Sequence, residues 1–595
     1  MHSRLLAWFP RLTLLLFLGP VAAGLLATLL PAFGILPVLG FVEPSLAPWR
    51  ALLAAPGLGT ALALSLASGL GSTLLALLAA VLIAAAFHGR PALRRIAGLL
   101  PPLVAVPHVA SAVGFAFLIA PTGLLMRGVA LATGQDRPFD LPLVQDPWGI
   151  ALLVGLALRE APFLLFTVLA ALGELHADRQ LAAARTLGLG PVEAWLRIVL
   201  PQLYGRIRLP VFAVLAFGLS VVDMAAVLGP TTPPTLAVLL FQWFADPDPA
   251  MRLQASAGAV LLLGVTIAVL VAWRLGETCL AVGLRPGLVG SPRPLRERCL
   301  LLGGVLARWL VLGAGLLGLA ALLLFSVSLR WRFPDLVPES LTLQHWQHGL
   351  GTLAGPAATS LAVGAGSALL ALVLALGCLE NERRRPAAPA RVLWLAYLPL
   401  VVPQIAFLFG FQMVLLALRL DGTITALLWA HLVFVFPYVL LMLRGPYLRL
   451  DPRFERAART LGRGRLASWL KIRLPLLLRP LAAALAVGFG VSIAQYLPTV
   501  FAGAGRWPTL TTETLALAVS GDRRLVGVAA VLLSVAPLLA VAAALGLPAW
   551  MERRRRRPAR LLQAPDPQAA SGANRASRSS SLKLRPAVPP PSTPS

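Results

Sequence analysis

The sequence has few of the residues from which most catalytic and metal sites are built. Its 595 residues include three cysteines, seven histidines and 24 acidic residues. The cysteines, Cys279, Cys299 and Cys378, lack both zinc-site spacing and an even number for disulfides, so we expect packing residues and no metal site. The scattered acidic and histidine residues argue against a membrane-embedded enzyme such as a lipid-linked transferase. The phosphate-binding pattern G-x-x-x-x-G-K-[ST] is also absent, so this chain is not expected to hydrolyse ATP.

Long apolar runs, by contrast, occupy most of the chain. Hydrophobic residues make up 58% of it and charged residues 13%, with a mean hydropathy of +0.82, which is more apolar surface than a soluble domain can bury. A helix needs about 20 apolar residues to cross a bilayer core. We find twelve such runs, centred on 12–30, 61–87, 96–120, 150–172, 207–229, 255–273, 309–327, 357–378, 392–416, 426–443, 481–502 and 525–545. The sequence therefore predicts an all-α integral membrane protein. The first run is too long for a signal peptide, so we expect an uncleaved span.

The basic residues behind the net charge of +27 are distributed as in a membrane protein and not as in a nucleic-acid-binding protein. Arginines gather after the even-numbered runs, at 90, 94, 95, 274, 285, 383–385 and 553–557. Under the positive-inside rule this distribution puts both termini in the cytoplasm. Segments 134–149 and 333–347 have fewer arginines and more Asp, Glu, Pro and Trp, which fits an outer surface. The lipid bilayer is an expected partner, and we expect no nucleic acid.

The twelve runs divide into two similar halves. The stretch from Ala105 aligns with that from Val401, which pairs Pro107 with Pro403 and Gly114 with Gly410. Each half holds an even number of spans, so the repeats are parallel. The boundaries we predict are a first repeat at 1–274, a cytoplasmic linker at 275–308, a second repeat at 309–547 and a tail at 548–595. That tail is basic and then rich in Ser and Pro, so we expect it to be disordered.

One polar segment occurs in both halves, between the fourth and fifth spans. Residues 181–201 and 455–475 share 12 of 21 aligned positions. Loops normally vary more than packed spans, so the similarity indicates a shared binding task. Asp451 and Pro452 can start a short helix, Gly462 and Gly464 can break it, and a second helix can follow until Pro475. The alternative is an amphipathic helix that lies on the membrane surface.

The repeated segment resembles the EAA motif of the permease subunits of ATP-binding-cassette (ABC) importers. That motif has E-A-A, then Gly after three residues, then I-x-L-P after nine more. The matching residues are Ala183, Ala184, Gly188, Ile198, Leu200 and Pro201 in the first copy and Ala457, Ala458, Gly462, Ile472, Leu474 and Pro475 in the second. Arg185 and Arg459 follow the alanines. The acidic residue is missing, because Ala182 and Arg456 stand at its position.

The resemblance implies the type I ABC importer permease fold in a bacterial inner membrane, with about twelve helices as two six-helix repeats. Loops 177–205 and 451–480 would then be coupling loops that seat in two separate ATPase subunits. ATP and Mg²⁺ would be bound by those partners, and this chain would bind no cofactor. A periplasmic or extracellular substrate-binding protein would set specificity. The double length and the phrase "DPRFERAARTLG" are most similar to the fused permeases of the thiamine- and iron(III)-type importers.

Polar residues inside the spans are candidates for the translocation path. Asp223 pairs with Gln495 in the repeat alignment, and Ser220 pairs with Ser492. The family resemblance implies that the fifth spans line the path, so these four side chains would face one another, although they could instead only join helices. His108 and Gln404, which follow the paired prolines, are further candidates. We expect Arg159 and Glu160 to neutralise each other.

One other transporter class has six plus six helices. A secondary transporter of the major facilitator type would usually carry an Asp- and Arg-rich loop between spans two and three, where this chain has "HGRPALRR". It would also have no need of duplicated docking loops. The ABC importer permease is therefore the preferred function, with a small solute or ion such as thiamine or ferric iron as its substrate.

Overall fold

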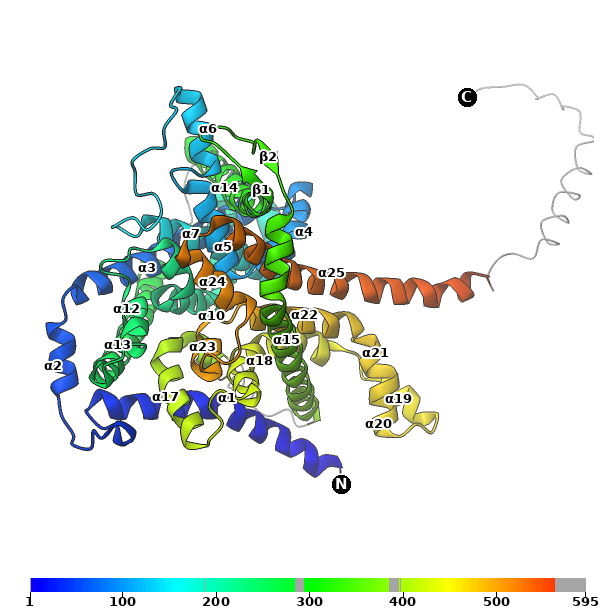
Figure 1. Ribbon diagram of the computed structural model, residues 1–595. Coiled ribbons are helices and arrows are strands. Elements are labelled where there is room, and N and C mark those ends of the chain that lie inside the picture. The colour runs from blue at the N-terminus through cyan, green and yellow to red at the C-terminus, as the bar shows by residue number, and fades with distance from the viewer. Residues whose placement is uncertain (1, 187, 284–293, 385–394, 396, 562–595) are drawn as a thin grey trace, which may run out of the picture. The chain divides into compact units, whose positions relative to one another are not determined.

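The structure is a computed structural model that describes residues 2–186, 188–283, 294–384, 395 and 397–561 (Figure 1). The first repeat contains α1 (His2–Ala32), η1 (Pro37–Leu39), α2 (Ala47–Ala54), α3 (Leu58–Phe87), α4 (Pro91–Ala105), α5 (His108–Ile119), α6 (Leu124–Thr133), α7 (Ile150–Leu172), α8 (Ala177–Thr186), α9 (Pro191–Ala194), η2 (Trp195–Val199), α10 (Leu200–Ser220), α11 (Asp223–Leu228), α12 (Leu236–Phe244) and α13 (Pro249–Gly283). The second contains α14 (Pro294–Val327), β1 (Ser328–Arg330), β2 (Ser340–Leu341), α15 (Gln344–Arg384), α17 (Gln404–Ala417), α18 (Ile424–Arg449), α19 (Arg453–Thr460), α20 (Arg465–Ser468), η4 (Trp469–Arg473), α21 (Leu474–Leu476), α22 (Leu478–Ile493), α23 (Leu497–Gly503), α24 (Leu510–Ser520) and α25 (Arg523–Leu561).

The all-α membrane architecture is confirmed, but the number of spans differs from twelve. In the described part of the chain, ten helices are long and apolar enough to cross a membrane. An eleventh is present if Arg465–Leu476 and Leu478–Ile493, which meet at 74°, count as one bent span. The remaining expected span is α17, whose 14 residues extend about 21 Å at 1.5 Å per residue. That is shorter than the apolar core of a bilayer.

Helix breaks divide two of the expected first-repeat spans. The run 96–120 consists of α4 and α5, which separate at Val106 because Pro107 cannot continue the hydrogen-bond ladder. The run 207–229 consists of α10 and α11, with Val221 in an extended conformation between them. The aligned span of the second repeat is interrupted at 494–496, between α22 and α23. The fifth span is therefore broken at corresponding places in both repeats.

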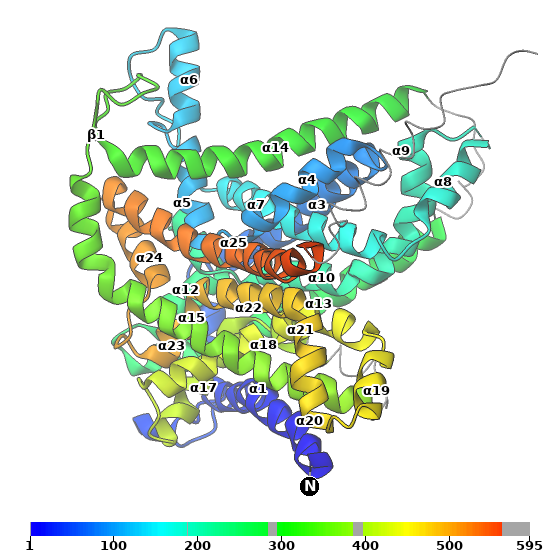
Figure 2. The ribbon, with the colours of Figure 1, turned by 90° about the vertical axis from the view of Figure 1, so that its right-hand side faces the viewer.

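The first helix of each repeat packs against the other repeat. Helix α1 lies against α15, α17 and α18, and α14 lies against α3, α5 and α7 (Figure 2). Both crossings use glycines that the repeat alignment pairs. A Cβ on Gly114 of α5 would lie 3.0 Å from the carbonyl oxygen of Gly318 in α14, and one on Gly410 of α17 would overlap the carbonyl oxygen of Gly24 in α1. These glycines let the two backbones approach closely, as in other membrane helix pairs.

The short elements β1, β2 and α6 lie at the end of the helices opposite to α8 and α19 (Figure 2). Buried Arg127 of α6 ties them together. Its guanidinium donates hydrogen bonds to the carbonyl oxygens of Thr122, at 3.0 Å, and Asp335, at 2.7 Å, and it lies 4.6 Å from the ring centroid of Trp331. The insertion between spans three and four thereby packs against the loop that leads into α15.

The described residues up to Ala544 form one compact unit, and those from Leu545 to Leu561 belong to a second. The boundaries between repeats, linker and tail stay predictions, since the exchanged helices join the two repeats in a single unit. The expected linker 275–308 includes the end of α13 and the start of α14, and its residues 284–293 lie outside the described part. Helix α25 continues to Leu561, so 548–561, the first part of the expected disordered tail, is helical. Residues 562–595 lie outside the description.

The expectation that all three cysteines pack in the interior is also wrong. Cys378 is partly buried, and its Sγ lies 3.2 Å from Thr13 Oγ1 of α1. Cys279 and Cys299 are exposed. They belong to the parts of α13 and α14 that flank residues 284–293, where little of the described chain covers them.

Candidate functional site

The two repeated loops form the same knuckle. In the first, α8 ends at Thr186, Gly188 adopts a positive φ of 78°, and α9 follows. In the second, α19 ends at Thr460, Gly462 has a φ of 80°, and α20 follows. Only glycine takes up this left-handed conformation at little cost, which explains why both copies keep it. The predicted pair of short helices that meet at a glycine is confirmed.

In each loop, one of the two adjacent alanines is buried and the other is exposed. Ala184 and Ala458 are buried and Ala183 and Ala457 are exposed. The carbonyl oxygens of the buried alanines accept hydrogen bonds from Leu189 N at 3.3 Å and Arg463 N at 3.1 Å, which closes each turn. Arg459 is exposed, and the side chain of Arg185 lies outside the described residues. The outer surface of the second knuckle also exposes Leu461, 82% of whose surface is accessible.

The Ile and Pro that both copies share lie on the helix that follows each knuckle. Ile198 and Ile472 are half-buried within the π-helical turns η2 and η4, and Pro201 and Pro475 occupy the first turn of α10 and α21. We expected the second helix to end at the proline, and that was wrong. In the first repeat the π-helical turn accommodates the proline, which has no N–H to donate. The helix therefore continues, and Pro191–Ser220 is one span. In the second repeat the bend comes after the proline, at Leu477.

A buried polar network supports the second loop. Arg473 of η4 is 1% exposed and forms an ion pair with Glu455 of α19. Its Nη2 donates a hydrogen bond to the carbonyl oxygen of Tyr447 at 2.7 Å, and its guanidinium lies 4.4 Å from the centroid of that ring. Trp469 Nε1 donates to the Tyr447 hydroxyl at 2.9 Å, and that hydroxyl donates to Glu380 of α15 at 2.7 Å. Glu455, which the sequence shows one residue before the usual acidic position, therefore acts inside the loop.

The first loop replaces this network with apolar contacts. Leu181 and Val199 occupy the positions aligned with Glu455 and Arg473, and both are buried in one hydrophobic cluster with Trp195. Nearby, His88 Nε2 lies 3.0 Å from the carboxylate of Asp178. The ion pair of one loop and the apolar pair of the other thus support the same backbone shape.

The bases of the two loops meet. Glu174, which precedes α8, lies 2.9 Å from Arg206 of α10 and 3.4 Å from Arg449 at the end of α18. Figure 2 shows α8 and α9 at the same end of the helices as α19 and α20. The chain therefore presents two similar knuckles on one face.

The candidate path residues of the first repeat gather near the break in the fifth span. His108 begins α5 directly after Pro107, its Nε2 lies 3.2 Å from Glu160 Oε1, and its ring centroid lies 4.6 Å from that of Phe217. Arg159 Nη2 donates to the carbonyl oxygen of Val104 at 3.2 Å. The expected neutralising pair of Arg159 and Glu160 is therefore incomplete, because each side chain hydrogen-bonds to another helix segment. Sequence reasoning undervalued Glu160, although its position inside a span was the available signal.

Asp223 starts α11 at this break and is 8% exposed. Among the described residues, its carboxylate accepts hydrogen bonds only from nearby backbone amides, including that of Met224 at 2.8 Å. It interacts electrostatically with His108 and Arg159 and also with Tyr496 of the second repeat. Asp223 therefore has no side-chain hydrogen-bond partner in the described chain, and Gln495 does not bond to it.

The two serines bond within their own repeats. Ser220 Oγ donates to the carbonyl oxygen of Ala216 at 2.8 Å. Ser492 Oγ accepts a hydrogen bond from Ser367 Oγ at 3.0 Å and lies 2.8 Å from Nδ1 of buried His431. His431, which the sequence analysis did not single out, joins α18 to α22 and α23. Gln404 begins α17 and is half-buried, and its role stays a prediction.

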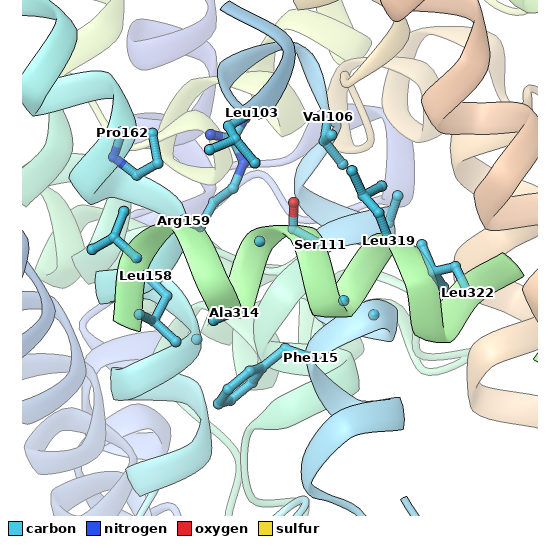
Figure 3. Close-up of a pocket in the computed structure, with 16 residues that line it drawn as sticks. Leu103, Val106, Ser111, Phe115, Leu158, Arg159, Pro162, Ala314, Leu319 and Leu322 are labelled. Carbon is cyan, nitrogen blue, oxygen red and sulfur yellow. The ribbon is translucent and has the colours of Figure 1, made fainter. Parts of the chain in front are cut away.

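A small cavity of about 60 Å³ lies beside Arg159, between α4, α5, α7 and α14 (Figure 3). Apart from Arg159 and Ser111, its lining is apolar or glycine. The Nε of Arg159 is buried and has no hydrogen-bond partner among the described residues. The volume is enough for a few water molecules.

The helices and the paired knuckles define the chain as a polytopic helical membrane protein with two similar loops on one face. No protein-family model matches it. Over 547 residues, which are 91% of this chain and 98% of the relative, it is 32% identical to the inner membrane ABC transporter permease protein YnjC of Escherichia coli (strain K12). The chain therefore belongs to the ABC transporter permeases of the inner membrane. As a permease it is a transport subunit and not itself an enzyme.

Proposed function

We propose that this chain forms both halves of the permease of an ABC importer, with both termini in the cytoplasm. It forms the substrate path and couples that path to two separate ATPase subunits, which bind ATP and Mg²⁺. A substrate-binding protein on the outer side delivers the substrate. The observation that carries the proposal is the pair of matching knuckles, each between the fourth and fifth spans of its repeat and both on one face.

The knuckles have the properties of a docking surface. Each presents an exposed alanine and a glycine turn that leave room for close approach, and the second adds exposed Leu461 and Arg459. Their buried faces pack on the same chain, so the exposed face is free for a partner. A surface helix on lipid would instead present a continuous apolar stripe, whereas α19 exposes several arginines. Family membership also leaves no observation in favour of a secondary transporter of the major facilitator type.

The substrate of this proposal is a small solute or ion such as thiamine or ferric iron. Its support is the resemblance to the fused permeases of those importers and the buried carboxylate of Asp223 at a broken span. A buried charge without a side-chain partner favours a counter-charge, so a cationic substrate would be stabilised there. Broken helices near the middle of a membrane are common at transporter binding sites.

Copurification tests the proposal directly. The tagged chain, coexpressed with a candidate ABC ATPase subunit, should retain two ATPase subunits per chain. Replacement of Gly188 or Gly462 by Leu should weaken retention or uncouple uptake, because both positions need a positive φ. Gly505, in the turn between α23 and α24, has a φ of 72° and open space around it and gives a matched control outside both knuckles. Normal ATPase retention and uptake in both loop variants would refute the coupling role.

A further inference from the structure

The first coupling loop receives its helix cap from the start of α14, the helix that leads into the second repeat. Gly190 precedes α9 and offers no side-chain cap, and Pro191 has no N–H, so the amides of Val192 and Glu193 lack acceptors within the helix. Both point at Glu297, in the first turn of α14. Its Oε1 accepts from Val192 N at 2.8 Å and its Oε2 from Glu193 N at 3.0 Å. A carboxylate at a helix N-terminus is favourable both as an acceptor and as a counter-charge to the helix dipole.

The fit between Glu297 and the loop is close. A Cβ on Gly190 would lie 2.5 Å from Glu297 Oε2, so a side chain there would displace the carboxylate. The side chain of Glu193 is 3% exposed and lies 2.6 Å from Arg197 Nη2 and 3.4 Å from Arg296 Nη1. Arg296 and Glu297 therefore hold the start of α9 through both a side chain and two backbone amides. The two arginines offset the repulsion between the neighbouring carboxylates of Glu193 and Glu297.

The second loop is held in a different way. Gly464 and Ala467 stand at the positions aligned with Gly190 and Glu193, and no side-chain acceptor on the first amides of α20 is present in the described chain. That loop is fixed instead by Arg473 and Glu455, with Arg383 of α15 at 3.4 Å from Glu455. All three belong to the second repeat. Only the first loop is therefore tied to a helix of the opposite repeat by these bonds.

The hydrogen bonds to Glu297 lie at one end of a long helical span. Pro191–Ser220 is a single span of 30 residues, about 45 Å at 1.5 Å per residue, and Asp223 follows its far end. A shift of α14 relative to the first repeat would pull on the amides of Val192 and Glu193. The same shift would move the knuckle that carries Gly188 and the broken end of the fifth span together.

We propose that Glu297 is a positioning residue that makes the first coupling loop follow α14 of the second repeat, whereas the second loop follows its own repeat. This inference rests on the proposed function, because it concerns how the two loops transmit ATPase closure. The two loops that contact the ATPase subunits then transmit movement to different sets of helices. Loss of the Glu297 carboxylate uncouples hydrolysis from uptake and does not prevent docking.

The test uses the full chain with its ATPase in proteoliposomes, and it measures retained ATPase, ATP hydrolysis and uptake for each variant. In Glu297→Ala we expect normal ATPase retention and a roughly tenfold fall in uptake per ATP hydrolysed, the scale of losing hydrogen bonds to a charged group. Glu297→Gln, which keeps one acceptor and the same shape, should restore most of that ratio. Gly190→Ala should resemble Glu297→Ala. Glu382→Ala, which removes a carboxylate 2.6 Å from Arg444 within the second repeat and no hydrogen bond of the first loop, is the control and should leave the ratio unchanged.

Two results would overturn the inference. One is an uptake-to-hydrolysis ratio in Glu297→Ala that matches the Glu382→Ala control. The other is a loss of ATPase retention in Glu297→Ala, which would make Glu297 an assembly contact and not a coupling one. Failure of the proposed function has a different signature, since the unmodified chain itself would then retain no ATPase.

Discussion

The ion pair between Glu455 and Arg473 permits a quantitative test, because the two repeats solve the same packing problem differently. The first loop has Leu181 and Val199 where the second has Glu455 and Arg473. The double replacement Glu455→Leu with Arg473→Val therefore installs a pair that already supports this backbone. We expect the free energy of local opening of the loop in the double variant to lie within about 1 kcal/mol of that in the unmodified chain. Well-packed apolar pairs often replace buried ion pairs without loss of stability.

We expect each single replacement to destabilise the loop more than the double replacement does. Glu455→Leu leaves a guanidinium that is 1% exposed without its carboxylate, and removal of one partner of a buried pair costs about 3–5 kcal/mol. Because Arg473 keeps the Tyr447 carbonyl and ring, we expect the lower end, about 3 kcal/mol. Arg473→Val leaves Glu455 near Arg383 at 3.4 Å, so it should cost only about 1–2 kcal/mol. The coupling energy between the two sites would then exceed about 2 kcal/mol.

Hydrogen exchange of the amides in 469–477 measures the local opening of this loop. A cost of 3 kcal/mol corresponds to exchange more than about a hundredfold faster in Glu455→Leu, with near-normal exchange in the double variant. Glu382→Leu breaks another ion pair on the same face and should leave the exchange of 469–477 unchanged. Additive effects of the two single changes would refute the reasoning, since the pair would then not act as a unit.

Two further predictions concern topology and the path. A reporter fused after Arg557 should be cytoplasmic and one near Asp335 external, and an external C-terminus would contradict the even division of spans. Asp223→Asn should lower uptake in reconstituted vesicles with normal membrane insertion and ATPase retention, and Asp223→Leu should lower it further, because it also removes the acceptor for the Met224 amide. Unchanged uptake in both variants would remove Asp223 from the path, and lost assembly would make it a structural residue.

Much of the candidate site was predictable because it depends on local chemistry. The glycine at each knuckle must supply a positive φ, so Gly188 and Gly462 were recognisable from their spacing alone. The partners of Glu455 and Glu160 were not predictable, since Arg473 and His108 are 18 and 52 residues away and many other side chains were equally available.

The path residues show a limit of alignment between repeats. Ser220 and Ser492 align, yet Ser220 bonds to its own helix and Ser492 lies beside His431, for which the first repeat has Ala157. Alignment gives the equivalent position on a helix. It does not give the neighbour, which depends on residues that have diverged between the repeats.

The sequence by itself determined the class of this protein. Apolar runs of bilayer length predict helices, because intrahelical hydrogen bonds satisfy the backbone inside lipid, and the repeated segment marked the two loops that we propose as coupling loops. Tertiary structure decided how the repeats combine. Helix α1 packs on the second repeat at Gly410 and α14 packs on the first repeat at Gly114, and Glu297 of α14 caps the first loop. The reason is physical. Hydrophobicity and turn chemistry act over a few residues and can be read along the chain, whereas a helix crossing is fixed by the shape of two surfaces that meet only after folding.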